Sequence, residues 1–326
     1  MPTADREKNV RLNTISAGIL FACSLALSAC NDQKSSAEQQ TQSSAEQQEI
    51  AKYNAYVETA NSLNTPFAKE LSDYRQYREP DVISGNKLDN YSVASSLAVT
   101  NIKEKLGKAT ALPFAMPEID APAKSFEEAL KKFEPIDSEL GNYADSKGYL
   151  SDGGKKARER NAAYVAALTD VANAEAAFLS GIEKRDELNT RTAFEKAAKD
   201  SQDYYRAGLI LNAKQAVRLG DAVFETQGSK EAIEPFRASL DQVAAMADGW
   251  DRKVKEATPN GCTSMMGAIN DFLALGRTVI QHAEHGDYVP RPDAPAWNLN
   301  NALQYDQGTF QLRFNAMIGI FNYPRC

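Results

Sequence analysis

The chain is poor in the residues on which most catalytic and metal sites depend. Its 326 residues include only two histidines, two tryptophans and four cysteines. Two histidines supply few general bases, and no Gly-x-Ser-x-Gly motif marks a nucleophilic serine. Glycine-rich phosphate loops are absent as well. We therefore expect no catalytic residues, no cofactor and no metal site, and an enzyme is the least favoured class of function.

Positive charge is also in short supply. The chain carries 37 Lys and Arg against 44 Asp and Glu, which gives a formal net charge of −7. Nucleic acids and anionic membrane surfaces attract proteins through clustered positive charge, so an acidic chain suits neither. We expect no nucleic-acid partner.

Long apolar runs are missing too. Residues 15–27 are mostly apolar and follow a weakly basic start that contains Arg6, Lys8 and Arg11. A run of about a dozen residues is too short for a spanning helix, which needs roughly 20, but it is typical of a secretory signal peptide. No later segment approaches a membrane span, so this run predicts export rather than a membrane-spanning protein.

The signal ends at Leu27-Ser28-Ala29-Cys30. These residues resemble the lipobox of bacterial lipoproteins, which implies cleavage before Cys30 and a lipid on its side chain. The alternative is an ordinary signal peptide with a chance cysteine. The resemblance also implies a place on the cell envelope, facing the periplasm. Asn31 favours the outer membrane, because an Asp there favours retention at the inner membrane, and Asp32 weakens that preference.

Three segments follow from this interpretation. Residues 1–29 form the signal peptide and include Cys23; residues 30–48 form a flexible tether, in which Ser-Ser-Ala-Glu-Gln-Gln occurs twice; and residues 49–326 form one helical domain. Such a polar tract buries too little apolar surface to offset the entropy lost on ordering. Removal of residues 1–29, with three basic and two acidic side chains, moves the net charge from −7 to −8.

Apolar residues in the domain recur at alternating steps of three and four, which predicts amphipathic helices. In the first helix this spacing predicts one inward face that includes Ile50, Tyr53, Val57, Leu71 and Tyr74. No segment shows the period-two alternation of strands. We therefore predict an all-α fold, an elongated bundle of about seven to eight long helices. Pro66 is expected to kink or split the first helix, and Pro135 to break the helix that begins at Ser125. The prolines of 110–123 are expected to form a rigid linker. The predicted helices cover residues 49–74, 88–107, 125–146, 155–182, 194–223, 229–254, 263–283 and 299–321.

Two cysteines remain for the mature domain if Cys30 carries the lipid. Cys262 precedes the seventh predicted helix and Cys326 follows the last one. An even pair in an oxidising compartment predicts a disulfide, and two buried free thiols are the alternative. Because the two helices are of similar length and a short loop joins them, we expect them to pack antiparallel, with both cysteines at one end.

Asparagines recur near both ends of the domain. Asn54 and Asn61 lie seven residues apart, as do Asn315 and Asn322, so each pair shares a helix face. A polar ladder that binds a ligand or sets helix register is one interpretation, and exposed or capping asparagines are the other.

Three patches carry a family resemblance. They are Tyr53-Asn54-Ala55-Tyr56-Val57 with Asn61; Lys147-Gly148-Tyr149 with Asp152 and Lys155; and Phe314-Asn315-Ala316-Met317-Ile318 with Phe321-Asn322. In this order, over roughly residues 46–323, they resemble the YiiG-like bacterial lipoproteins, a family of unknown function. The chain departs from that pattern at Gly153-Gly154 and at Met317. The resemblance implies a helical lipoprotein domain and supplies no catalytic residues.

Three further features each have a simpler explanation. His282 and His285 share a helix face but lack further metal ligands, so solvation of a helix end is favoured. Tyr204-Tyr205 could form a sugar platform, although core packing explains it better. Glu175 falls on an apolar stripe, so it lies at the edge of that stripe or makes a polar contact.

These observations favour a lipid-anchored binding or scaffold protein with an unidentified envelope protein as partner. An immunity or inhibitor lipoprotein that neutralises a basic toxin is an alternative, because the chain is acidic. An envelope hydrolase is the remaining one.

Overall fold

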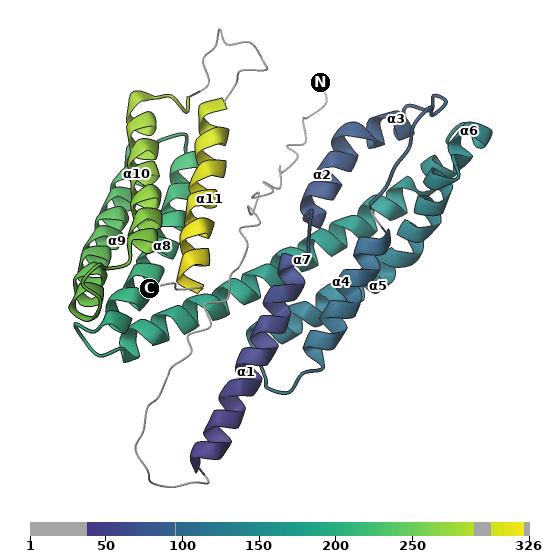
Figure 1. Cartoon of the computed structure of the whole chain (residues 1–326). Coiled ribbons are helices and arrows are strands. Elements are labelled where there is room, and N and C mark those ends of the chain that lie inside the picture. Colours follow the sequence, from purple (N-terminus) through teal and green to yellow (C-terminus); the bar gives the residue numbers. More distant parts are fainter. Residues whose placement is uncertain (1–37, 95, 290–300, 323–326) are drawn as a thin grey trace, which may run out of the picture. The chain divides into compact units, whose positions relative to one another are not determined.

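The computed structural model describes residues 38–94, 96–289 and 301–322, and within them every regular element is an α-helix (Figure 1). The all-α prediction is confirmed. Cα positions divide the chain into two compact units. Unit 1 contains the described residues up to Arg185, and unit 2 begins at Asp186, so the division falls inside helix α7 (Lys155–Lys196). Cys30 and Cys326 lie outside the described residues.

Unit 1 contains six helices and most of the seventh. They are α1 (Glu38–Asn61), α2 (Phe67–Tyr77), α3 (Glu79–Ile83), α4 (Ser96–Thr110), α5 (Pro117–Asp145), α6 (Gly148–Asp152) and α7. Aromatic side chains fill its core: Phe126 of α5 lies 5.8 Å from Phe178 of α7, and Phe133 lies 5.4 Å from Tyr164, measured between ring centroids. All four rings are at most 1% exposed.

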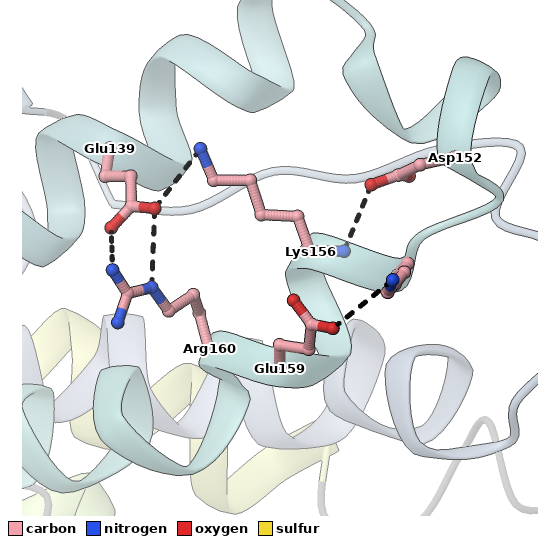
Figure 2. A pocket seen from close by; sticks show the side chains of 6 residues that line it. Glu139, Asp152, Lys156, Glu159 and Arg160 are labelled. Carbon is pink, nitrogen blue, oxygen red and sulfur yellow. Dashed lines mark hydrogen bonds and ion pairs between the residues drawn. The ribbon is translucent and has the colours of Figure 1, made fainter.

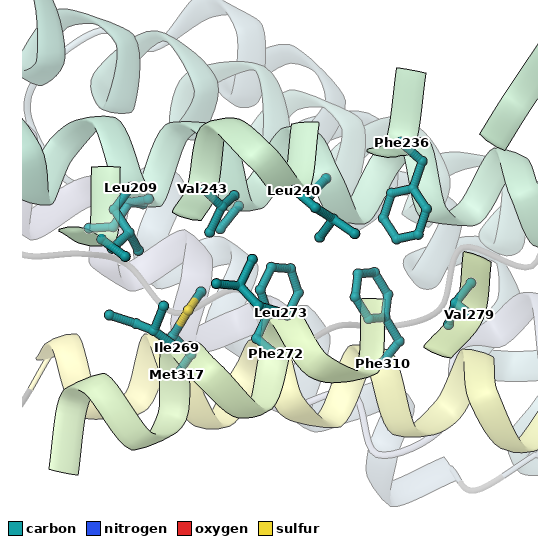
Figure 3. Close-up of a cluster of buried hydrophobic side chains, with 14 of the residues drawn as sticks. Leu209, Phe236, Leu240, Val243, Ile269, Phe272, Leu273, Val279, Phe310 and Met317 are labelled. Atoms are coloured by element: carbon teal, nitrogen blue, oxygen red, sulfur yellow. The ribbon is translucent and has the colours of Figure 1, made fainter. Parts of the chain in front are cut away.

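Unit 2 is built on four long helices, α8 (Gln202–Glu225), α9 (Lys230–Ala257), α10 (Thr263–His285) and α11 (Asn301–Asn322). Each packs against the next in sequence, and α11 closes the arrangement against α8. Phe236, Leu240, Phe272 and Phe310 meet at its centre, as Figure 3 shows. Serines cap two of these helices, because Ser201 and Ser229 accept hydrogen bonds from the third helical N–H.

Helices α10 and α11 run antiparallel, as predicted. Asp271 pairs with Arg313 at 3.2 Å, and His282 with Asp306 at 2.6 Å, so residue numbers fall along α11 as they rise along α10. The start of α10, where Cys262 is buried, is therefore level with the end of α11. Because Cys326 lies outside the described residues, its disulfide with Cys262 stays a prediction.

Several predicted helix boundaries were wrong, chiefly where a proline was expected to end or interrupt a helix. The linker expected at 110–123 is only 111–116, because Pro117 occupies the first turn of α5, where a missing N–H costs nothing. Helix α5 then continues through Pro122 and Pro135, so the predicted start at Ser125 and break at Pro135 do not occur. Pro66 does separate α1 from α2, as predicted, and stands at the N-cap of α2.

Two helix starts also differ from the prediction. The helix expected at 88–107 is α4, which begins at Ser96. Helix α1 begins at Glu38, inside the tether predicted for 30–48, so it includes the whole second Ser-Ser-Ala-Glu-Gln-Gln copy and the last three residues of the first. The rest of that tether lies outside the described residues.

One described helix, α7, is long and apolar enough to cross a bilayer by length and composition alone, which the sequence analysis had not expected. Its side chains Tyr164, Leu168 and Phe178 are buried in unit 1, at no more than 1% exposed. A buried core helix can have the same length and apolar composition as a membrane span, so these two properties alone do not identify α7 as one.

Candidate functional site

A recess of about 460 Å³ lies where α5, α6 and α7 meet in unit 1 (Figure 2). Every side chain that lines it carries a charge. Glu139 comes from α5, Asp152 from the end of α6, and the first two turns of α7 supply the rest, which are Lys155, Lys156, Glu159 and Arg160. Asp152 and Lys155 belong to the central patch on which the family resemblance was based, so the structure adds four charged neighbours to that patch.

The turn between α5 and α7 positions Asp152. Lys147 has φ 54°, and Gly153 and Gly154 have φ 65° and 88°, so the chain enters and leaves the one-turn helix α6 in the left-handed region. A Cβ atom on Gly154 would lie 2.5 Å from Leu88 Cγ, so this position has no room for a side chain. The left-handed backbone at these positions and the contact with Leu88 therefore fix the turn that carries Asp152.

Both carboxylate oxygens of Asp152 accept hydrogen bonds, and two of these bonds cap α7. Its Oδ1 accepts hydrogen bonds from the backbone N–H of Gly154 at 2.8 Å and from the Tyr143 hydroxyl at 2.6 Å. Its Oδ2 accepts one from the backbone N–H of Lys156 at 3.1 Å. Its carboxylate stabilises the positive end of the α7 dipole, and this explains why the long helix begins here.

Glu139 bridges α5 to α7 through two cations. Its Oε2 lies 2.8 Å from Arg160 Nη2, and its Oε1 lies 3.2 Å from Lys156 Nζ and accepts a hydrogen bond from Arg160 Nε at 3.3 Å. The guanidinium thus holds the carboxylate with both prongs of its fork. By contrast, Lys155 and Glu159 are 3.9 Å apart and highly exposed, at 73% and 63%, so this pair is weak.

Both bonded carboxylates are held in their ionised forms. The hydrogen bond from Arg160 lowers the pKa of Glu139 below its ordinary value, with Lys156 adding to the effect. Desolvation would raise the pKa of Asp152, but the hydrogen bonds from Tyr143 and the α7 backbone outweigh it and lower the pKa. A general acid or base works best with a pKa near the ambient pH, so these groups suit binding better than proton transfer.

A second charge cluster, which the sequence analysis missed, fastens α1 to α5. Lys52 is only 3% exposed, and its Nζ lies 2.9 Å from Asp120 Oδ1. The same ammonium donates to the carbonyl of Phe114 at 2.8 Å, and Asp120 also accepts from the Tyr56 hydroxyl at 2.5 Å and the backbone N–H of Met116 at 2.9 Å. Each polar group is satisfied, so we interpret this cluster as structural.

The four asparagines do not form one site. Asn54 and Asn61 lie on the exposed face of α1 in unit 1, whereas Asn315 is half-buried on α11 in unit 2, 3.5 Å from the Gln311 amide. Asn322 ends α11. The large residues beside them, such as Tyr56, Met317 and Phe321, are buried core positions, so packing accounts for much of the two terminal patches.

His282 has a specific partner, contrary to the helix-end solvation that the sequence favoured. Its Nδ1 lies 2.6 Å from Oδ2 of the buried Asp306, which also accepts from the Tyr288 hydroxyl at 2.7 Å. Within the described residues, no group of three or more His, Cys, Asp and Glu is arranged to hold a metal ion. The contact joins α10 to α11 and explains His282 without a ligand.

Tyr204 and Tyr205 are half-buried rather than deep in the core. Phe194 stacks on Tyr204 with ring centroids 4.7 Å apart, and Lys199 Nζ lies 4.4 Å from the Tyr204 centroid. The Tyr205 hydroxyl donates to Asp200 at 2.8 Å. Because Phe194 and Lys199 both contact Tyr204, packing within unit 2 explains the pair better than a sugar platform does.

No curated protein matches the chain, and no solved structure matches it. A family model described as a protein of unknown function, DUF3829, matches residues 47–322. The match includes all the residues that line the recess and nearly all of both units. The chain therefore belongs to the DUF3829 family of proteins of unknown function.

Proposed function

We propose that this chain is a non-catalytic, lipid-anchored binding module of the bacterial cell envelope, and that the charged recess is where it contacts its partner. The observation that carries the proposal is the recess itself. Its lining consists of charged side chains, and its two bonded carboxylates have lowered pKa values. This combination favours recognition of a charged group over acid–base chemistry.

The lipobox supports the proposed location. A lipid on Cys30 would anchor the chain to the envelope membrane, facing the periplasm, and Asn31 favours the outer membrane. Two or more acyl chains anchor stably, since each buried methylene contributes ~0.8 kcal/mol. The likeness to YiiG-like lipoproteins, as distinct from membership of the DUF3829 family, belongs to this proposal. An envelope protein is the proposed partner, and the acidic net charge of −7 argues against nucleic acid.

Carbodiimide cross-linking on intact cells, followed by affinity capture, tests the proposal, because this reagent joins carboxylates to amines in contact. The recess variant is Lys155→Gln with Glu159→Gln, an exposed pair whose loss leaves the Glu139 bonds in place. The matched control is Lys69→Gln with Asp73→Asn, a pair at 2.7 Å with the same helical spacing on α2.

The wild type and the control should capture the same partner, and the recess variant should lose it. Equal capture by all three proteins would reject the recess as the contact site. The anchor is tested separately with Cys30→Ser, which should abolish fatty-acid labelling; unchanged labelling would reject the lipoprotein assignment.

A further inference from the structure

The segment that forms one wall of the recess is a local reversal of charge. Residues 147–160 contain five Lys and Arg and two Asp and Glu, which makes this segment net positive in a chain of net charge −7. Lys155, Lys156 and Arg160 line the recess together with three carboxylates, and Arg158 beside them donates to the Gly153 carbonyl at 3.0 Å. A negatively charged ligand is the natural complement of such a wall.

Some donors in the recess have no acceptor within hydrogen-bond distance among the residues that line it. Arg160 contacts Glu139 through Nε and Nη2, which leaves the Nη1 N–H groups without an acceptor among the residues that line the recess. A lysine ammonium has three N–H donors. Lys156 Nζ contacts one carboxylate oxygen, Oε1 of Glu139, to which Arg160 Nε also donates. Lys155 Nζ is 3.9 Å from Glu159, beyond hydrogen-bond distance.

Glu139 shows which chemical group these cations bind. A carboxylate already lies in the recess, held by the fork of Arg160 and by Lys156 (Figure 2). Arg recognises planar carboxylates through two parallel bonds, and the arrangement around Glu139 has this form. A second carboxylate can bind the remaining donors, or it can displace Glu139 from Arg160 and Lys156.

From these contacts we infer that the recess binds an acidic peptide segment of a partner protein, through side-chain carboxylates that contact Lys155, Lys156 and Arg160. The inference rests on the proposed function and names the chemistry of the partner. Asp152 takes no part in the binding, because its oxygens already accept from Gly154, Tyr143 and Lys156. Glu139 acts as an internal competitor.

If Glu139 competes with the peptide, loss of its charge and loss of the cations should change the peptide affinity in opposite directions. Binding of a fluorescent glutamate-rich peptide to the full-length protein is measured at low salt. Glu139→Gln removes the competing charge and should tighten binding, whereas Lys155→Gln with Arg160→Gln should weaken it by at least about tenfold. Added salt should weaken binding to the wild type. The control changes are Glu127→Gln and Lys131→Gln, which remove an ion pair of 2.6 Å on α5, and they should leave affinity unchanged.

Helical circular dichroism and the melting temperature show whether each variant folds. If Lys155→Gln with Arg160→Gln unfolds, Glu139→Gln and Lys155→Gln alone decide the question. A Glu139→Gln variant that binds no better than the wild type, or an equal affinity for a glutamine-rich peptide, overturns the inference. So does binding of inorganic pyrophosphate with the same dependence on the variants when the peptide fails to bind.

The two proposals fail in different ways. If the acidic peptide does not bind but the recess variant still loses its partner in cross-linking, the carboxylate chemistry is wrong and the recess remains the contact site. If neither experiment responds to the recess, both are wrong.

Discussion

Glu175 of α7 caps helix α2: its Oε2 accepts a hydrogen bond from the backbone N–H of Phe67 at 2.8 Å. The side chain is only 2% exposed and lies on the helix face that buries Val171 and Phe178. Desolvation raises the pKa of this carboxyl to about 7, although hydrogen bonds from Phe67 and Ala68 oppose the rise. Of the two possibilities that the sequence left open for Glu175, the polar contact is correct.

The raised pKa predicts a stability that falls with pH. The folded form binds its proton up to about pH 7, whereas a free glutamate releases it near pH 4.5. Protonation therefore stabilises the fold fully below about pH 4.5, and this contribution, ~3 kcal/mol at most, is lost as the pH rises through 7. Glu175→Gln keeps the acceptor for Phe67 without the titration. Urea unfolding between pH 5 and 8 should show a downward slope in the wild type that the variant lacks.

The same experiment has an internal control. Trp250 is buried in unit 2, Trp297 lies outside the described residues, and Glu175 belongs to unit 1. Circular dichroism follows both units, and the fluorescence of Trp250, measured in a Trp297→Phe background, follows unit 2. If the pH slope is equal in the wild type and Glu175→Gln by circular dichroism, the interpretation of Glu175 is wrong.

Gly181 should not tolerate alanine. A Cβ atom there would lie 2.3 Å from the backbone oxygen of Glu118, so α7 and α5 would have to separate. We expect Gly181→Ala to lower the free energy of unfolding by about 1–3 kcal/mol, despite the better helix propensity of alanine. In the matched change Gly107→Ala on α4, the new atom would meet only Glu127 Oε1, at 3.7 Å. That variant should be neutral or more stable by up to ~1 kcal/mol, and thermal unfolding of the two variants compares them directly.

The buried pair Lys52–Asp120 should be costly to break from one side. Asp120→Asn leaves an ammonium that is 4% exposed without its counter-charge, and we expect a loss of roughly 3–5 kcal/mol. Lys52→Met together with Asp120→Asn removes both charges and should recover much of that loss. Urea unfolding of the two single variants and the double variant measures the coupling. Additive losses would show that the two side chains do not depend on each other.

The disulfide predicted between Cys262 and Cys326 rests on the sequence, and it would tie the chain end to the start of α10. In the chain-entropy model, a bridge across this loop stabilises the fold by about 4 kcal/mol. Reduction should therefore lower the midpoint of the Trp fluorescence transition. Alkylation of the unreduced protein, followed by mass measurement, should find neither thiol reactive; two alkylated cysteines would exclude the bridge.

The apolar pattern was enough to predict the helices but not the contacts between them. Tyr53, Val57, Leu71 and Tyr74 were predicted to face the core and are all buried, because a three-four spacing fixes one face of a helix. Ile50 belonged to the same stripe and is 41% exposed, since the face extends beyond the body that covers it. Local spacing states which side of a helix is apolar and not where that side ends.

The candidate site was only partly visible in the sequence. Asp152 and Lys155 were singled out through the family resemblance, whereas Glu139 and Arg160, which lie on different helices, were not. Their contact depends on how α5 packs on α7, and no local pattern encodes that packing. The accumulation of Lys and Arg over residues 147–160 was the one signal that could have drawn attention to the recess. The same limit concealed Lys52 and Asp120, whose charges predicted solvent exposure.

The support beneath Asp152 has a consequence for how this family can change over generations. Tyr143 donates to Asp152 Oδ1 at 2.6 Å, and a Cβ atom on Gly148 would lie 2.6 Å from the ring of that same tyrosine. A replacement at any of these three positions alters what the other two can be. Among relatives, Tyr143, Gly148 and Asp152 should therefore be inherited as a set, and a lineage that has lost the tyrosine should also have been released from glycine at the neighbouring turn.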